Sequence, residues 1–138
     1  MNAKLHKLIG TAALGLALFS NSLPARAGLA TRNEVYIDPS GTTAQGSLTG
    51  ARYSADNGQY IGCDVYFDRR PNSGPWASAY CFAGDKTGRS TYCSSTDARF
   101  IDAVKGMTDS SHLYFRVSST FTRVCSDLEV TNDSAYLK

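Results

Sequence analysis

Four cysteines, Cys63, Cys81, Cys93 and Cys125, are the feature that most constrains the fold. An even number of cysteines in a short chain with an export signal predicts two disulfides. Each disulfide typically stabilises a small domain by ~2–4 kcal/mol, mainly by restricting the unfolded chain. A zinc site is the rival use of these residues, but no C-x-x-C pair occurs and His112 is the only histidine outside the leader. We therefore expect two disulfides and no metal or other cofactor.

The export signal is residues 1–27, which have the three-part layout of a secretory signal peptide. A basic start precedes the apolar run Leu8–Phe19, which is shorter than the ~20 residues that cross a bilayer. The segment closes with an Ala-x-Ala cleavage site at Ala25–Ala27. We expect a secreted or periplasmic protein whose residues 28–138 form a single disulfide-bonded β domain, with no membrane insertion after cleavage.

Removal of the leader changes the net charge of the chain. The full sequence has 14 basic and 12 acidic residues, and Lys4, Lys7 and Arg26 belong to the leader. The remaining 11 basic residues face 12 acidic ones, so the net charge becomes −1. A weakly acidic domain gains little from the phosphate attraction that dominates nucleic-acid binding. Nucleic acid is therefore not an expected partner.

The dipeptide Asn57-Gly58 predicts a central β-hairpin over Ser47–Phe67, because a type I′ turn requires positive φ at both central residues. A two-residue turn there pairs Leu48 with Phe67 and divides the side chains between two faces. The face expected in the core carries Leu48, Ile61, Cys63, Val65 and Phe67, and the other carries Tyr53, Tyr60 and Tyr66. The tyrosine face is expected either to be covered by a helix or to stand exposed beside Trp76.

Two further hairpins are predicted downstream. The first joins Ala77–Ala83 to Arg89–Ser94 through a glycine-containing turn centred on Thr87. The second joins Ser111–Val117 to Arg123–Thr131, and alternation directs Leu113, Phe115 and Val117 inward.

Three other segments complete the predicted fold. Asn33–Asp38 has the alternation of a short strand, and Asp68–Trp76 is dense in turn formers and predicts a long loop. Ala98–Lys105 predicts the one short helix, with Asp97 at its positive end and Gly106 in a left-handed conformation after it. With about seven strands, we expect a mainly β fold, either an antiparallel sandwich or a strongly curved sheet. An α+β fold is the alternative.

The disulfide pairing has two solutions. The predicted register places Cys81 opposite Cys93, within reach of a disulfide, which leaves Cys63 and Cys125 as the second pair. In Val124–Thr131, however, Cys125 alternates with the apolar residues, so the Cys63–Cys125 bond requires a bulge near Cys125. Without a bulge, Cys93–Cys125 and Cys63–Cys81 become the pairs.

The sequence offers little support for catalysis. It contains no G-x-S-x-G, P-loop or H-E-x-x-H motif, and an isolated outward His112 is a weak candidate for a general base. Paired carboxylates remain as a hydrolase alternative, because Asp64 with Asp68, or Asp127 with Glu129, share a strand face. We assign no catalytic residue.

Aromatic residues give the stronger functional signal. Tyrosine and tryptophan rings beside polar groups can stack on sugars or anchor a protein partner. We expect a non-enzymatic binding or inhibitor-like module that recognises an exported protein or a glycan. Its candidate binding residues are Trp76, Arg69, Arg70 and Tyr66. The third alternative is an extracellular structural component.

Two segments carry a resemblance: A-R-Y-S-A-D-N-G-Q-Y-I-G-C at Ala51–Cys63 and C-F-A-G-D-K-T-G-R-S-T-Y-C at Cys81–Cys93. Together with the four cysteines, they resemble small exported bacterial proteins with a Y-I-G-C motif. The resemblance covers about half of the expected mature chain. It implies export and carries no assigned activity.

Overall fold

The computed structural model describes residues 33–70 and 74–132, and the predicted signal peptide lies outside these ranges. The described residues form β1 (Tyr36–Ile37), β2 (Thr43–Ser47), α1 (Leu48–Arg52), β3 (Tyr60–Arg70), β4 (Gly74–Gly84), β5 (Ser90–Ser95), α2 (Ala98–Lys105), β6 (His112–Val117) and β7 (Cys125–Thr131). The predicted mainly β fold with about seven strands is confirmed. Neither helix of this part of the chain is long and apolar enough to cross a membrane.

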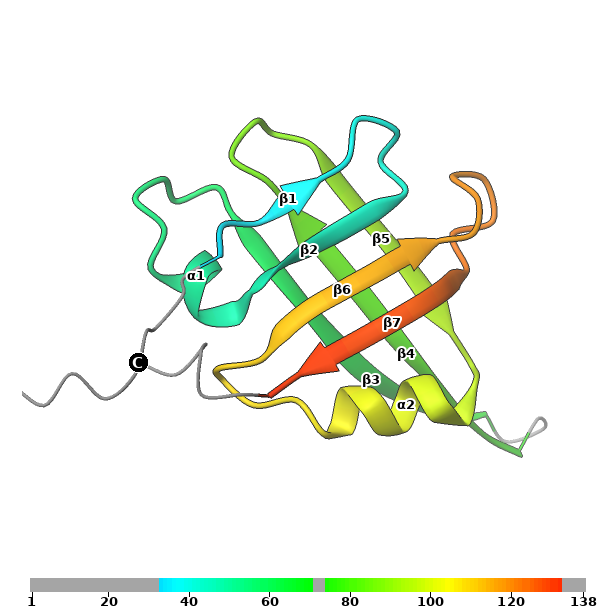
Figure 1. Cartoon of the computed structure of the whole chain (residues 1–138). Helices are drawn as coiled ribbons and strands as arrows, with labels where there is room; N and C mark the ends of the chain where they lie inside the picture. The colour runs from blue at the N-terminus through cyan, green and yellow to red at the C-terminus, as the bar shows by residue number, and fades with distance from the viewer. Residues whose placement is uncertain (1–32, 71–73, 133–138) are drawn as a thin grey trace, which may run out of the picture.

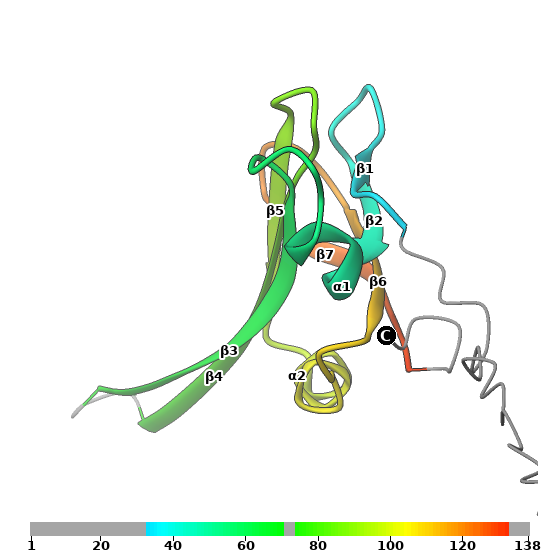
Figure 2. The same ribbon diagram turned by 90° about the vertical axis from the view of Figure 1, so that its left-hand side faces the viewer.

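The strands form two antiparallel sheets that face each other. One sheet has the order β1-β2-β6-β7 and the other the order β3-β4-β5, and their strands cross in Figure 1. Alternation directs one face of each sheet into the shared core, where Leu113 and Phe115 of β6 are fully buried against Ala79 and Cys81 of β4. Helix α2 lies between the sheets at one end (Figure 2). The structure is therefore a β-sandwich with one end closed by a helix.

Helix α2 forms where the sequence predicts it. The Asp97 side chain accepts a hydrogen bond from the Arg99 amide at 2.9 Å and caps the first turn. Ile101 and Val104 are buried on the side that faces the sheets. The left-handed conformation predicted for Gly106 is wrong: its φ is −80°, and its amide closes the helix by bonding to Asp102 and Ala103 carbonyls.

The predicted hairpin over Ser47–Phe67 is wrong. Its first arm is helix α1, because the Ser47 hydroxyl accepts from the Gly50 amide at 2.8 Å and caps a helical turn. Asn57-Gly58 belongs to a turn closed by Asp56, whose carboxylate accepts from the amides of Gly58 and Gln59. Strand β3 therefore starts a new hairpin with β4.

The β3–β4 hairpin also replaces the loop predicted over Asp68–Trp76. The strands pair from Tyr60 opposite Gly84 to Arg70 opposite Gly74. Strand β5 pairs only with Ala79–Gly84, so β3 is the sole described partner for the rest of β4. Figure 2 shows this two-stranded arm bending away from the sandwich. Phe67 lies on the arm and is 66% exposed, which contradicts its predicted place in the core.

The disulfides follow the second predicted solution, Cys63–Cys81 and Cys93–Cys125. Cys81 lies opposite Cys93, as predicted, but it also lies opposite Cys63 and bonds to it. The first solution, Cys81–Cys93 with Cys63–Cys125, is wrong, and so is the predicted link between a bulge and that solution. A bulge is present next to Cys125, because the register shifts between Arg116 and Val117 and leaves Ser126 as the extra residue.

That bulge turns Cys125 toward the core, where it is 5% exposed. The backbone beside it is held against β5, because the Ser94 amide donates to the Arg123 carbonyl at 2.9 Å and Ser94 forms a parallel bridge with Val124. Cys125 therefore meets Cys93 of β5, and their bond joins the two sheets.

Candidate functional site

The outer side of the β3-β4-β5 sheet carries the strongest candidate site. Alternate residues of these strands point away from the core, and six of them are aromatic. We call this set the aromatic face: Tyr60, Tyr66, Trp76, Tyr80, Phe82 and Tyr92. Phe82 is half-buried, and the other five are between 38% and 60% exposed. Large exposed rings gathered on one side of a sheet are typical of an interaction surface.

The rings contact one another across the strands. The Phe82 centroid lies 6.2 Å from that of Tyr60 and 5.9 Å from that of Tyr80. Tyr80 also lies 5.6 Å from Tyr92, over which the Arg123 guanidinium sits at 4.8 Å. These separations fall in the favourable range for aromatic pairs and for a cation–π contact. The rings therefore restrict one another's positions.

Two glycines keep the surface flat. A Cβ atom on Gly84 would lie 2.4 Å from a Tyr60 ring carbon, and one on Gly62 would lie 3.3 Å from a Phe82 ring carbon. The rings of Tyr60 and Phe82 thus lie over the backbone of these glycines. Glycine in the interior of a strand weakens the strand, and here the rings cover the two glycine positions. The covered positions and the rings together form a broad aromatic surface.

No aliphatic side chain interrupts the aromatic face. Its other described positions are Gly62, Asp64, Asp68, Ser78, Gly84, Ser90 and Ser94. The aliphatic residues of these strands, such as Ile61 and Ala79, point to the core. The face therefore combines flat rings with hydroxyl and carboxylate groups.

The described elements leave the aromatic face uncovered. Both helices and the β1-β2-β6-β7 sheet lie on the opposite side of β3-β4-β5, and the bent arm makes the aromatic side concave (Figure 2). The alternative in which α2 covers the tyrosines is therefore wrong, since α2 lies on the core side.

The predicted binding residues are only partly brought together. Tyr66 and Trp76 lie on the aromatic face as diagonal neighbours, because Tyr66 pairs with Ser78 and Trp76 with Asp68. Arg69 and Arg70 end β3, but their side chains lie outside the described part. Tyr53, predicted to share this face, lies instead in the turn after α1.

Sequence reasoning missed Tyr80, Phe82 and Tyr92. A signal was present, because Tyr80 and Phe82 flank Cys81, and Tyr92 precedes Cys93. A disulfide cysteine points into the core, so its neighbours on a strand must point outward.

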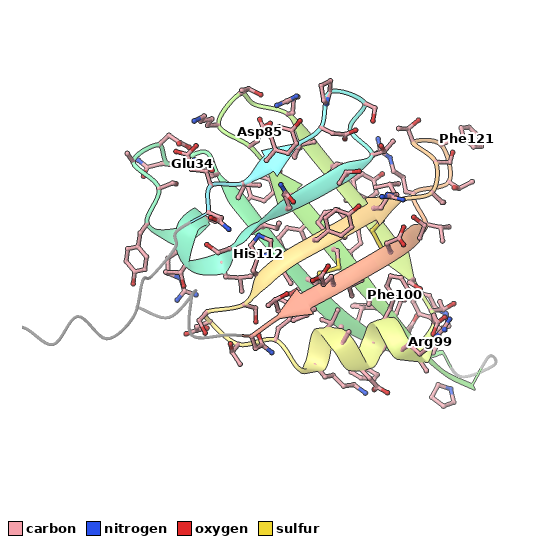
Figure 3. All side chains as sticks on the ribbon, in the orientation of Figure 1. Glu34, Asp85, Arg99, Phe100, His112 and Phe121 are labelled. Atoms are coloured by element: carbon pink, nitrogen blue, oxygen red, sulfur yellow. A yellow bond between two sulfur atoms is a disulfide. The ribbon has the colours of Figure 1, made fainter. Side chains whose placement is uncertain are left out.

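The carboxylate pairs are poorly arranged for hydrolysis. Asp64 and Asp68 are four residues apart on one strand, about 13 Å, whereas glycosidase pairs are ~5–9.5 Å apart. Asp127 and Glu129 line an open groove of ≈ 440 Å³ beside Arg99 and Phe100, which Figure 3 labels on α2. Both carboxylates are exposed, and nothing among the described residues excludes water from them.

The groove contains a polar network rather than an isolated acid. The Tyr114 hydroxyl accepts from the Arg116 guanidinium at 2.8 Å, and this bond, with the nearby Asp127, raises the pKa of Arg116. Arg116 also approaches Asp127 at 3.7 Å. At the mouth, the Arg99 side chain donates to Asp97 and lowers the pKa of that carboxyl to about 2. This pattern is typical of a solvated, ion-paired surface.

Metal binding finds no support in the described ranges. No group of three or more His, Cys, Asp or Glu side chains is placed there to hold an ion. Every buried side-chain nitrogen or oxygen in those ranges has a hydrogen-bond partner. The aromatic face can stack on a ligand and can form hydrogen bonds with it.

Comparison with known proteins adds no assignment. No protein-family model and no curated protein match the sequence, and no solved structure matches the chain.

Proposed function

We propose that this protein is a non-enzymatic binding module whose aromatic face binds a glycan. The observation that carries the proposal is the composition of that face: six aromatic rings, two carboxylates and several serines, with no aliphatic side chain among its described positions. A sugar presents an apolar C–H surface that stacks on an aromatic ring and a rim of hydroxyls that need hydrogen-bond partners. The aromatic face supplies both.

A protein partner fits the face less well. The centre of a protein interface is depleted in charge and excludes water, so Asp64 in the middle of the rings would become a buried, unpaired carboxylate. Sugar hydroxyls can donate to the same carboxylate. Single-stranded nucleic acid also stacks on rings, but it requires a basic groove, and Asp64 places a carboxylate opposite Tyr80 in the middle of this face.

Export is part of the proposal. Two disulfides are typical of proteins that work outside the reducing cytosol, and extracellular glycans are abundant there. The signal peptide expected over residues 1–27 would deliver the chain to that compartment. The resemblance to small exported bacterial proteins agrees with this location and supplies no activity.

The test is retention of the oxidised mature protein on cellulose, chitin, xylan and mannan. Replacing both rings on the arm, Tyr66→Ala with Trp76→Ala, should weaken retention at least tenfold, because it removes two ring surfaces and buried apolar surface contributes ~25 cal/mol per Å². Phe121→Ala is the matched control, since Phe121 is 94% exposed on the β6–β7 loop and is not one of the six rings of the aromatic face (Figure 3). Its retention should be unchanged.

Two results would contradict the proposal. One is equal retention of the double variant and the wild-type protein, with thermal unfolding confirming that both are folded. The other is no retention of the wild-type protein on any glycan, together with specific capture of an exported protein, turnover of a substrate, or concentration-dependent self-assembly. These outcomes would favour the inhibitor-like, hydrolase or structural alternative.

A further inference from the structure

We infer that the glycan is an uncharged linear chain that lies along the β3–β4 ribbon and is contacted through several consecutive sugars. This inference rests on the proposed function and adds the class of ligand and its mode of binding. Three features carry it: the length of the ring row, its open centre and its charge.

The row of rings is long. Tyr60, Phe82, Tyr80, Tyr66 and Trp76 follow one another along the paired strands. From Tyr60, which lies opposite Gly84, to Trp76 the ribbon advances eight residues, or about 26 Å at ~3.3 Å per residue. One or two sugars would cover only a small part of this row. A chain can use all of it.

The centre of the row is open. A module that grips the end of a glycan needs a pocket with walls around the terminal sugar. Tyr80 at the centre of the row is 38% exposed, and both helices and the other sheet lie on the opposite side of β3-β4-β5, so no described element forms a wall around it. This geometry favours an internal stretch of chain that continues in both directions.

The charge on the row selects against acidic chains. Asp64 lies directly opposite Tyr80 at the middle of the row. Arg123 stands beyond the row, over Tyr92 of β5. A uronate or sulfated chain would therefore bring its charges beside Asp64, where like charges repel. A neutral chain would donate its hydroxyls there instead.

The test is calorimetric titration with oligosaccharides of increasing length. The probes are cello- and xylo-oligosaccharides from two to six sugars, with oligogalacturonides of the same lengths as the acidic comparison. The inference predicts at least a tenfold rise in affinity from two sugars to six on one neutral ladder, and binding of the acidic six-sugar chain at least tenfold weaker. Tyr80→Ala should weaken six-sugar binding about tenfold, because it removes the central ring. Phe121→Ala should leave it unchanged.

The outcomes separate the two claims. If the wild-type protein is retained on a neutral polysaccharide but binds two and six sugars equally, the extended mode is wrong and the glycan-binding function stands. Equal affinity for the acidic and neutral chains would overturn the charge selection in the same way. If no polysaccharide retains the protein, the proposed function fails and this inference fails with it.

Discussion

Asp85 is a buried carboxylate that accepts several hydrogen bonds within its own turn. It begins the β4–β5 turn, and its side chain is 2% exposed (Figure 3). The carboxylate accepts from the Thr87 amide and hydroxyl at 2.9 and 2.6 Å, and from the Arg89 amide and Nε at 3.1 and 2.8 Å. Burial alone would raise its pKa, but these donors outweigh burial and lower the pKa below its ordinary value of 3.8. Asp85 is therefore ionised in the folded state and holds the turn.

Asp85→Asn should reduce the free energy of unfolding by about 3 kcal/mol near neutral pH, since it leaves buried donors without a charged acceptor. A carboxyl with a lowered folded-state pKa stabilises the fold above its unfolded pKa, and that stabilisation is lost as the pH falls through the folded value. The difference between wild type and variant should therefore shrink below about pH 4. Denaturant unfolding at several pH values measures it.

The matched control is Asp102→Asn. Asp102 forms an exposed helical pair with Lys105 at 3.2 Å, and such pairs contribute about 0.3–0.5 kcal/mol. Equal losses for the two variants at neutral pH would contradict the role assigned to Asp85.

At the scale of elements, the β3–β4 ribbon is a stabilising unit as well as the proposed binding surface. The Tyr60 ring covers Gly84 on the neighbouring strand, and a Cβ atom there would lie within 3.0 Å of three Tyr60 ring carbons. The ring has no room to stay in place above a larger residue. The flatness of the face thus depends on a glycine in the partner strand.

Gly84→Ala should displace the Tyr60 ring, lower the free energy of unfolding by about 1–3 kcal/mol and weaken glycan retention. Gly106→Ala is the control, because Gly106 has a right-handed backbone and the new Cβ would meet its nearest neighbour at 3.4 Å. We expect that variant to unfold within about 0.5 kcal/mol of wild type. Wild-type stability in Gly84→Ala would show that the ring does not lie over the glycine.

At the scale of the whole molecule, the sequence predicts elements that are determined by neighbouring residues. It predicts less well which strands pair with each other. Helix α2 has its own cap at Asp97, and the β4–β5 and β6–β7 hairpins combine alternation with short turns. Alternation alone does not specify the partner of β3, because it suits pairing with Leu48–Ala55 as well as with β4. The hydrogen bond from the Gly50 amide to the Ser47 hydroxyl favours the helix α1 in that segment, so the segment does not pair with β3.

Alternation also fails to specify the disulfide pairing and the full extent of the aromatic face. Cys81 has a cysteine directly opposite on each side, so alternation cannot choose between Cys63 and Cys93. The choice follows from the bulge at Ser126 and the packing of Cys125 against β5, which are tertiary features. The sequence indicates Tyr66 and Trp76 as candidate binding residues, and both lie on the aromatic face. They lie on the same face as Tyr80 only because β3 pairs with β4 in this register.

The single tryptophan of the chain gives the most direct measurement, because Trp76 lies at one end of the aromatic face. Titration of the oxidised protein with a neutral six-sugar chain should change the Trp76 emission to saturation, and Tyr80→Ala should shift the midpoint about tenfold to higher concentration. The account predicts that this midpoint equals the calorimetric dissociation constant. Emission that stays constant while calorimetry shows the same chain binding would place the glycan elsewhere and contradict the aromatic face as the binding surface.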